Sequence, residues 1–402
     1  MLTTAEATQA IAESMPSYAS ENVDYAGATG RILHQSVSAE RDQPPFDRVM
    51  MDGIAVRFDS LAAGTRQFVI QGTQHAGDPV QTLADDENCI EIMTGGVLPR
   101  KSDCIIPVEQ IAVAGNVATV EEGYQAERLQ FVHAQGSDHR EGQEVLHVGT
   151  RISPMDIAII ASCGLESVLV GKPPVVRVIS TGNELIAPGN PVADHQIRMS
   201  NGPALVAMLW QQGFADTTHD HLVDEPALLK QRIADHLQEA DVLILSGGVS
   251  MGKADFVPQV LADLSVNVVF HKISQRPGKP MWFGKGPDEQ IVFALPGNPV
   301  SALVCCRQYV LPALLRATGR NDATQETATL REAVTFNPSL TCFLPVRTSV
   351  LSDGKISATP VPTNTSGDFA ALSGTDGYVE LPREQSDFAA GSLVRLHRWA
   401  AP

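Results

Sequence analysis

Metal-binding cysteine motifs, long apolar runs and an excess of basic charge are all missing from this 402-residue chain. Its six cysteines form no Cys-x-x-Cys pair and have no histidine-rich tract beside them, which argues against a zinc or iron–sulfur site. We expect all six to be small buried side chains in a reducing, cytoplasmic compartment. No apolar run reaches about 18 residues, so no membrane span is expected. The first residues also lack the basic and apolar regions of a signal peptide.

The shortage of positive charge also narrows the choice of partners. A formal net charge of −17 argues against a surface that binds nucleic acid or an anionic membrane. Lys272, Arg276 and Lys279 nevertheless gather in one short segment that ends in a Pro-Gly-Lys-Pro turn. The prolines fix the backbone of such a turn and aim its basic side chains. This local reversal of the overall charge indicates a site for an anion, although ordinary surface cations are the alternative.

The length of the chain predicts several domains, because a single core of this size is unusual. We expect an elongated mixed N-terminal domain formed by residues 1–41 and 139–171, interrupted by a β insert domain at 42–138. An α/β domain follows at 172–320, and a small C-terminal β-barrel-like domain covers 321–402. The fold class is therefore multi-domain α/β plus β.

Local patterns support these assignments. Thr3 and Glu6 have the spacing of a capping box before a helix, and a second helix is expected over Tyr25–Leu33. An Asp-Gly turn inside Thr348–Ser357 predicts a β-hairpin in the last domain. A helix is expected after Pro154, and the insert carries short apolar runs typical of strands. These runs are Arg66–Ile70, Cys89–Met93, Cys104–Pro107 and Asn116–Val120.

From Val175 onward, buried strands alternate with helices. Strands are expected at Val175–Ser180, Asp241–Leu245 and Ile291–Leu295, and helices at Pro203–Gln212 and Ala227–Leu237. Such alternation predicts a doubly wound, mostly parallel sheet whose binding sites lie at the carboxyl ends of its strands.

Two glycine- and proline-rich loops follow strands of this predicted sheet. The first, Ser246–Asp255, contains Gly247, Gly248 and Ser250, and the second is Pro296–Ser301. Strand-to-helix turns of this kind expose backbone N–H groups at the positive end of a helix, where anions bind. Pro299 suits the first turn of a helix, because its missing N–H costs nothing there. Together with the cationic turn, the loops predict a pocket for a phosphorylated or oxyanionic ligand.

Carboxylates also occur beside these loops. Glu184 follows the first strand of the α/β unit, Asp224 precedes a helix, and Asp255 ends the first glycine loop. A Mg²⁺ ion that uses one or two carboxylates together with phosphate oxygens would suit this set. The alternatives are a solvated turn for Glu184 and helix capping for Asp224 and Asp255. In the insert, Asp52 and Thr94 each precede glycine, and a structural turn is the default interpretation of both.

Taken together, these motifs resemble the molybdopterin molybdenumtransferase family, which includes the C-terminal domain of gephyrin. The resemblance covers essentially the full chain, because the motifs occur in the family's order and the remainder fits its domain plan. Arg276 departs from the family, in which lysine commonly begins this turn. The matching segments are Met51–Ala55, Ile92–Gly96, Ser180–Leu185, Ser246–Asp255, Arg276–Pro280 and Pro296–Ser301.

The resemblance implies a Mg²⁺-dependent transferase that inserts molybdenum from molybdate into adenylylated molybdopterin and releases AMP. It implies a homodimer in which the cleft lies between the α/β domain of one subunit and the insert of the other. Transient contact with molybdopterin adenylyltransferase and with apo-molybdoenzymes is also implied. The implied catalytic residues are Asp52, Asp224, Asp255, Lys272 and Arg276, and the implied metal ligands are Glu184, Asp224 and Asp255. The implied substrate-binding residues are Thr94, Ser246, Gly247, Gly248, Ser250, Lys279, Pro296, Pro299 and Ser301.

Two alternatives stay open at this point. A molybdopterin adenylyltransferase-like enzyme would share the α/β unit, but it would not need the insert or the C-terminal domain. A non-catalytic molybdopterin-binding scaffold would keep the fold without turnover. AMP transfer from ATP would distinguish the first, and tight binding without AMP release the second.

Overall fold

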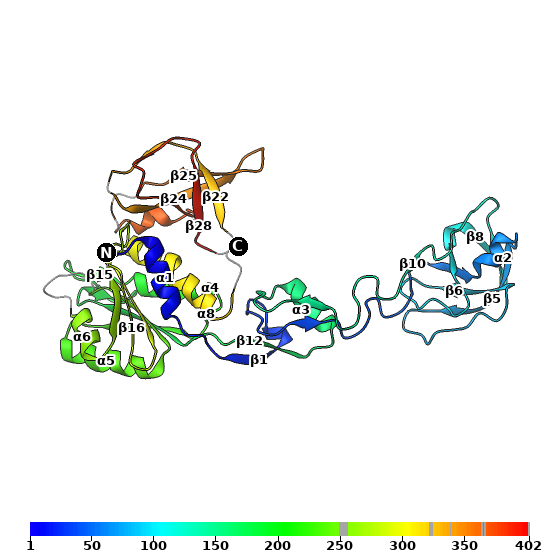
Figure 1. Cartoon of the computed structure of the whole chain (residues 1–402), viewed down its shortest axis with the longest axis horizontal. Helices are drawn as coiled ribbons and strands as arrows, with labels where there is room; N and C mark the ends of the chain where they lie inside the picture. The colour runs from blue at the N-terminus through cyan, green and yellow to red at the C-terminus, as the bar shows by residue number, and fades with distance from the viewer. Residues whose placement is uncertain (249–255, 321–324, 338, 363–364, 366, 401–402) are drawn as a thin grey trace. The chain divides into compact units, whose positions relative to one another are not determined.

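Two compact units make up the chain in the structure, a computed structural model (Figure 1). Unit 1 comprises residues 1–34, 148–153 and 167–402, and unit 2 comprises residues 35–147 and 154–166. The four domain boundaries expected from the sequence divide the chain differently and stay a prediction. The structure describes residues 1–248, 256–320, 325–337, 339–362, 365 and 367–400.

A six-stranded sheet in the order β16-β13-β17-β21-β20-β18 forms the centre of unit 1. Strand β13 pairs in parallel with β16 and β17, and β17 pairs in parallel with β21. At one end of the sheet, β20 pairs antiparallel with β21, and the edge strand β18 pairs antiparallel with β20. The strands are β13 (Val176–Thr181), β16 (Thr217–Leu222), β17 (Val242–Ser246), β18 (Asn267–His271), β20 (Trp282–Lys285) and β21 (Ile291–Leu295).

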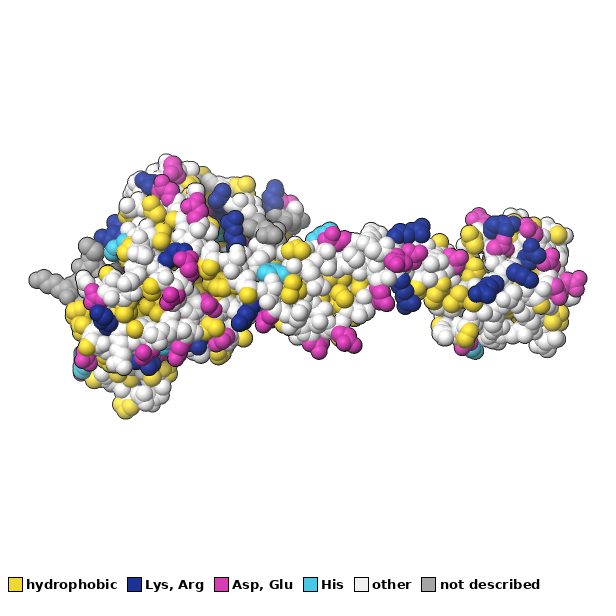
Figure 2. Space-filling view, turned by 60° about the horizontal axis from the view of Figure 1, so that its bottom comes forward, with side chains coloured by type: hydrophobic (Ala, Val, Ile, Leu, Met, Phe, Trp, Pro, Cys, Tyr) yellow, Lys and Arg dark blue, Asp and Glu magenta, His cyan; other side chains and the backbone are white. Residues whose placement is uncertain are grey.

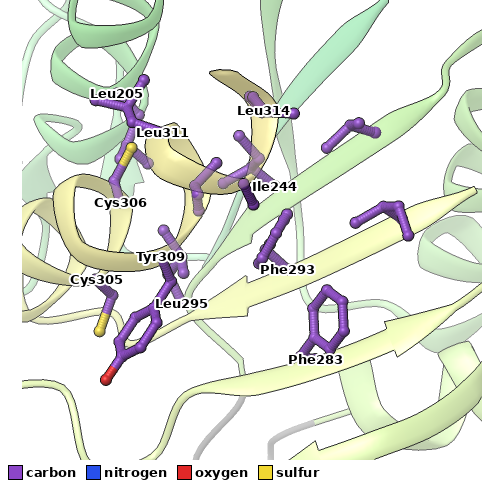
Figure 3. Close-up of a cluster of buried hydrophobic side chains, with 14 of the residues drawn as sticks. Leu205, Ile244, Phe283, Phe293, Leu295, Cys305, Cys306, Tyr309, Leu311 and Leu314 are labelled. Atoms are coloured by element: carbon purple, nitrogen blue, oxygen red, sulfur yellow. The ribbon is translucent and has the colours of Figure 1, made fainter. Parts of the chain in front are cut away.

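Helices cover both faces of this sheet. Alternate side chains of each strand point to opposite faces, and each set enters a separate core between the sheet and the helices. Val242 and Ile244 of β17 pack with helices α1, α4, α7 and α8, and part of this core is drawn in Figure 3. Leu243 and Leu245 pack with α5 and α6. The expected doubly wound α/β domain is therefore confirmed. The helices are α1 (Thr4–Ser14), α4 (Asn201–Gln211), α5 (Pro226–Glu239), α6 (Val257–Asp263), α7 (Pro299–Cys305), the π-helical segment η3 (Cys306–Val310) and α8 (Leu311–Ala317).

Helix α1 begins with the expected capping box. The Thr3 hydroxyl accepts a hydrogen bond from the Glu6 backbone N–H (3.2 Å), and the Glu6 carboxylate accepts one from the Thr3 N–H (2.8 Å). Ala7 and Ile11 on the opposite face enter the core of the α/β domain. The first helix thus belongs to unit 1 through its apolar face.

The helix expected over Tyr25–Leu33 is wrong. Only a short 3₁₀ turn, η1 (Tyr25–Gly27), forms there. Ile32 and Leu33 instead make antiparallel bridges to Arg151 and Val170, so distant backbone pairing overrides the local helical pattern. The preceding strand β1 (Ser20–Asp24) pairs with β12 (Ser167–Gly171).

The segments α7, η3 and α8 form one continuous apolar stretch, Pro299–Ala317. Among the residues that the structure describes, it is the one helix long and apolar enough to cross a membrane by length and composition. However, 61% of its most apolar window is buried inside the protein, and Ala302, Tyr309 and Leu314 pack on the central sheet. The stretch therefore serves as a core helix of the α/β domain.

The C-terminal part of unit 1 is a closed five-stranded barrel, as expected. Its sheet runs β24-β25-β22-β28-β26, and β26 pairs with β24 to close the ring. The predicted hairpin is confirmed by the pairs Ser349↔Ser357 and Val350↔Ile356. Strand β19 (Gln275–Arg276), from the middle of the α/β domain, joins this sheet beside β24. The other elements are β22 (Glu326–Leu330), β23 (Val334–Thr335), β24 (Thr341–Val350), β25 (Ile356–Pro360), η4 (Phe369–Leu372), β26 (Gly377–Leu381), β27 (Asp387–Phe388) and β28 (Leu393–Arg398).

Unit 2 is built on a second six-stranded sheet, in the order β7-β4-β6-β5-β9-β8. All four β runs expected in the insert are strands of this sheet, and the helix expected after Pro154 is present. On the face shown in Figure 2, acidic and basic side chains are mixed over this unit, and Arg57–Asp86 is one of its ion pairs. Its elements are β2 (Val37–Ser38), β3 (Arg48–Val49), β4 (Gly53–Val56), α2 (Phe58–Ala62), β5 (Gln67–Gln74), β6 (Asn88–Ile92), β7 (Cys104–Pro107), η2 (Val108–Gln110), β8 (Ile111–Ala114), β9 (Val117–Val120), β10 (Val132–His133), β11 (Glu144–Leu146) and α3 (Pro154–Ser162).

All six cysteines are buried and unbridged, as the composition predicted. Burial raises the pKa of the Cys104 thiol to about 11 and that of Cys306 to about 12. These thiols therefore remain protonated near neutral pH and behave as small apolar side chains.

Gly53 provides a test of the packing in unit 2. A Cβ at this position would lie 2.0 Å from the backbone oxygen of Ile106 on the paired strand β7. We predict that Gly53→Ala lowers the free energy of unfolding by about 3 kcal/mol, because the backbone must shift. Gly115→Ala is the control: it has a φ of +65° and open space around it, so about 1 kcal/mol is expected.

Urea unfolding would measure the loss in the free energy of unfolding of each variant. Hydrogen exchange of peptides from β4 and β7 would measure the loss at the paired strands. Equal losses for the two alanine variants would contradict the assigned close approach.

Candidate functional site

Four parallel strands bring most of the predicted site residues to one edge of the central sheet. The register pairs Thr181 with Leu222, and Ser246 with Leu295, at the carboxyl ends of β13, β16, β17 and β21. The segments that follow these strands start at this edge. They carry Glu184, Asp224, Gly247 with Gly248, and Pro296 to Ser301.

The two acidic loops are joined by an asparagine. The Asn183 side-chain oxygen accepts a hydrogen bond from the Asp224 backbone N–H (3.0 Å). Glu184 is exposed and Asp224 is half-buried. A Cβ on Gly182 would lie 2.6 Å from a carboxylate oxygen of Glu184, so the Glu184 side chain lies against the turn.

The capping role considered for Asp224 does not describe its position. The N-cap residue of α5 is Glu225, and the Glu225 side chain makes no capping bond. Asp224 instead lies one residue earlier, in the segment that leaves β16. The Gly182 carbonyl on the neighbouring loop is held by the His221 ring of β16 (2.8 Å).

The glycine loop after β17 starts close against β13. Gly247 and Gly248 have φ values of +104° and +63°. A Cβ on either would come within 3.0 Å of the Thr181 hydroxyl oxygen, so both the backbone conformation and the lack of space require glycine. Thr181 is buried, and its hydroxyl has no hydrogen-bond partner among the residues that the structure describes. Ser250 and Asp255 lie outside the described residues.

Asn201, at the start of α4, ties the two glycine- and proline-rich loops together. Its side-chain nitrogen donates to the Ser246 hydroxyl (2.9 Å) and to the Gly297 carbonyl (2.8 Å). A Cβ on Gly297 would also approach the Gly247 Cα atom at 3.6 Å. The two loops therefore lie side by side at the strand ends.

The second loop leads directly into the core helix. Pro296 is buried, Pro299 is the first residue of α7 as expected, and Ser301 lies in the first turn with an exposure of 4%. The burial of Ser301 leaves its backbone and hydroxyl less open to a ligand than the sequence suggested. The exposed part of this loop is Gly297 and Asn298.

The cationic turn is tightly closed by backbone hydrogen bonds. The Lys272 N–H donates to the Met281 carbonyl (2.8 Å), and the Ile273 N–H donates to the Lys279 carbonyl (2.9 Å). Arg276 and Lys279 are exposed, and Lys272 is half-buried. The turn therefore presents cations to solvent while its backbone stays fixed.

Asp52 and Thr94, at weak motifs far apart in the sequence, meet in unit 2. One Asp52 carboxylate oxygen accepts hydrogen bonds from both the Thr94 N–H and the Thr94 hydroxyl, each at 2.7 Å. These bonds lower the pKa of Asp52 below its ordinary value of 3.8. The pair therefore presents an exposed, permanently charged carboxylate near neutral pH.

The acidic set can be tested against a Mg²⁺ ion. No group of three or more possible metal ligands occurs in the part of the chain that the structure describes. Glu184 and Asp224 nevertheless come from adjacent strand ends joined by Asn183. This arrangement suits a metal that takes its remaining oxygen ligands from phosphate and water, and it does not suit a metal enclosed by protein ligands alone.

Sequence reasoning missed Asn183, Thr181 and Asn201, although each lies at a strand end or helix start in the site. Asn183 and Thr181 stand in the Thr-Gly-Asn-Glu segment, which was considered only for its glutamate. Asn201 lies two residues before the helix expected at Pro203–Gln212, which begins at Asn201 in the structure. An asparagine at the start of a helix, close to a predicted ligand-binding loop, is the sequence signal that could have identified Asn201.

Three family matches cover nearly the whole chain. The family described as "MoeA N-terminal region (domain I and II)" matches residues 2–164, and "Probable molybdopterin binding domain" matches residues 177–316. The family described as "MoeA C-terminal region (domain IV)" matches residues 327–399. The insert, the α/β domain and the barrel are thus all matched.

Individual relatives agree with these matches. A molybdopterin molybdenumtransferase from Synechocystis sp. is 38% identical over 404 residues, which cover 99% of this chain and 100% of the relative. Another of that name from Synechococcus elongatus is 32% identical over 387 residues, 94% of each chain. The structure of a molybdopterin biosynthesis moea protein from Pyrococcus horikosii has a TM-score of 0.84 at 28% identity, and it covers 100% of both chains. The chain therefore belongs to the molybdopterin molybdenumtransferase (MoeA) family, as the sequence motifs indicated.

Proposed function

We propose that this protein is the transferase that inserts molybdenum from molybdate into adenylylated molybdopterin and releases AMP. The observation that carries the proposal is the meeting of two acidic loops and two glycine- and proline-rich loops at one sheet edge. Family membership supports the same activity, because the relatives are named for it. The working compartment proposed is the cytoplasm.

The substrates are anions, and the site offers two kinds of groups to hold them. Lys272, Arg276 and Lys279 supply positive charge, and the loops at Gly247 and Gly297 let a phosphate approach the backbone closely. Positive groups fixed in place stabilise the charge that develops when a phosphoryl bond breaks. The guanidinium of Arg276 adds a planar pair of donors that the lysine common in the family lacks.

Asp224 is the proposed orienting group for the attacking oxygen of water or molybdate. When water supplies the oxygen, it attacks the phosphorus of the adenylate, the anhydride bond breaks with the molybdopterin phosphate as the leaving group, and AMP is released with the new oxygen. When molybdate supplies the oxygen, the same displacement forms an AMP–molybdate anhydride, and its hydrolysis by water releases AMP and molybdate. A carboxylate in this role accepts a proton or a hydrogen bond from the attacking group. Glu184 and Asp224 would hold Mg²⁺, which would neutralise charge on the phosphate oxygens.

The Asp52–Thr94 pair is proposed to serve the site of the other subunit in a homodimer. Its exposed carboxylate is bonded to Thr94 and has no basic partner among the residues that the structure describes. The family resemblance supports a position for this motif in the cleft. Transient docking of the adenylyltransferase and of apo-molybdoenzymes is proposed on the same resemblance.

AMP release tests the proposed function directly. The purified chain is given adenylylated molybdopterin and Mg²⁺, with and without molybdate, and AMP is measured together with active molybdenum cofactor. We expect molybdate-dependent AMP release that is lost when EDTA removes the metal. Binding without AMP release would support a scaffold, and AMP transfer from ATP would support an adenylyltransferase.

Asp224→Asn should lower turnover by about 100-fold, because the amide cannot accept a proton. Its effect on stability should stay within about 1 kcal/mol, since the side chain is half-buried and the change is isosteric. Asp216→Asn is the matched control. Asp216 precedes β16 at the opposite edge of the same sheet and pairs loosely with Arg177 (3.4 Å). Undiminished AMP release by the Asp224 variant would remove this residue from the mechanism.

Mixed dimers test whether the insert serves the partner's site. Asp52→Asn and Asp224→Asn chains, each nearly inactive alone, should regain about one quarter of wild-type activity when subunits exchange at equal amounts. Half of the dimers are then mixed, and each mixed dimer has one intact site. A mixture of Lys272→Ala and Asp224→Asn chains should regain no activity, because both substitutions lie in the α/β domain and each site of a mixed dimer then carries one of them. The shared-site proposal fails if the first mixture also stays inactive while native gels show mixed dimers.

A further inference from the structure

A buried amide links the cationic turn to the core helix. Gln275 is fully buried, at 0% exposure, and its side-chain nitrogen donates to the Pro277 carbonyl (3.0 Å) inside the turn. Its side-chain oxygen accepts a hydrogen bond from the Tyr309 hydroxyl of η3. The amide therefore joins the segment that carries Arg276 to the helical stretch Pro299–Ala317.

A second contact presses the same turn onto the same helix. A Cβ on Gly278 would lie 2.4 Å from the Cys305 sulfur and 2.6 Å from the Gln275 side-chain nitrogen. The Cys305 thiol lies 3.7 Å from the Gly278 carbonyl, to which it donates. Gly278 has a φ of +90°, so glycine is required here both by conformation and by space.

The other side of the turn is held by the C-terminal barrel. Gln275 and Arg276 pair in parallel with Thr341 and Cys342 of β24. Successive side chains of a strand point to opposite sides, so Gln275 enters the core while Arg276 is exposed. The Arg276 guanidinium lies 5.9 Å from the centre of the Phe336 ring, within the range of a cation–π contact.

The Tyr309 hydroxyl is suited to a permanent donor role. The ring lies in the apolar core, and in Figure 3 its oxygen points away from Leu311 and Leu314. Burial raises the pKa of Tyr309 well above its ordinary value of 10.0, so the hydroxyl stays protonated. Removing the donor would leave the Gln275 oxygen buried and unpaired, which is more costly than losing an exposed bond.

We propose that Gln275 and Tyr309 are positioning residues, which hold Arg276 and Lys279 in register with the Pro296–Ser301 loop. The helix fixes the cationic turn relative to the loop, because Ser301 of the loop and Tyr309, which bonds to Gln275, belong to one continuous helical stretch. The Ser301 backbone oxygen also lies 3.7 Å from the Cβ position of Gly278. This inference rests on the proposed function, since it assigns the cations to anionic substrates.

Tyr378 provides a matched control for Tyr309. It is also fully buried, and its hydroxyl also donates to a glutamine oxygen, that of Gln308, at 2.8 Å. Its bond runs between the barrel and η3 and does not reach the cationic turn. Tyr309→Phe and Tyr378→Phe therefore remove the same atom from similar surroundings, and a general loss of core stability affects both.

The experiment compares the melting temperatures and the Michaelis constants of the two variants. We expect similar decreases in melting temperature, because each variant loses one buried hydrogen bond. Tyr309→Phe alone should raise the Michaelis constant of molybdate or of adenylylated molybdopterin by about fivefold or more, with kcat within about twofold. Gln275→Met, which removes the bonds of the amide to Pro277, Cys305 and Tyr309, should shift the same constant in the same direction.

Hydrogen exchange gives a readout that does not depend on activity. The amides of Ile273 and Met281, bonded within the turn, should exchange faster in Tyr309→Phe than in Tyr378→Phe. Equal exchange and equal Michaelis constants in the two variants would overturn the positioning role. If the wild-type protein releases no AMP, the proposed function fails, and faster exchange in Tyr309→Phe would still establish the link between turn and helix.

Discussion

The parallel pairing of β13, β16, β17 and β21 is the constraint on which the rest of unit 1 depends. Burial on both faces fixes the register, because a shift by one residue would exchange the side chains of the two cores. Once the register is fixed, the segments after these strands must begin at the same edge. The acidic loops and the two glycine- and proline-rich loops therefore meet at that edge.

Close backbone approach is the second requirement of the site. Gly247 and Gly248 lie against Thr181, and Gly278 lies against Cys305. At each place a side chain would separate two segments that the site needs in contact. The Thr181 hydroxyl beneath the first loop, which has no partner among the residues that the structure describes, adds a buried polar group whose cost is offset elsewhere in the fold.

The sequence predicted the α/β core well because strong local signals and burial agree there. The run Ile291–Leu295 is a strand with those bounds in the structure, and the Thr3–Glu6 capping box starts α1. Tyr25–Leu33 was wrong because its bridges to Arg151 and Val170 depend on residues more than a hundred positions away. Strand β16, with its sequence Thr-Thr-His-Asp-His-Leu, lacks an apolar run and was not anticipated.

The site was predicted as a set of residues but not as an arrangement. Motifs identified Glu184, Asp224 and the two loops, whereas the bonds from Asn183 and Asn201 depend on which strands become neighbours. The contact between Asp52 and Thr94 likewise requires the pairing of β4 with β6. Ser301 was expected to be open to a ligand, and its burial follows from the packing of α7 on the sheet.

Strand β19 limits how the C-terminal barrel of this protein can be removed or exchanged. Two residues of the cationic turn belong to the hydrogen-bonded sheet of the barrel, although the barrel begins some fifty positions later in the chain. An α/β domain cut away from the barrel would lose the backbone partners of Gln275 and Arg276. Exchange of the barrel between relatives must therefore preserve the edge of β24, because the last domain helps to hold the cationic turn in place.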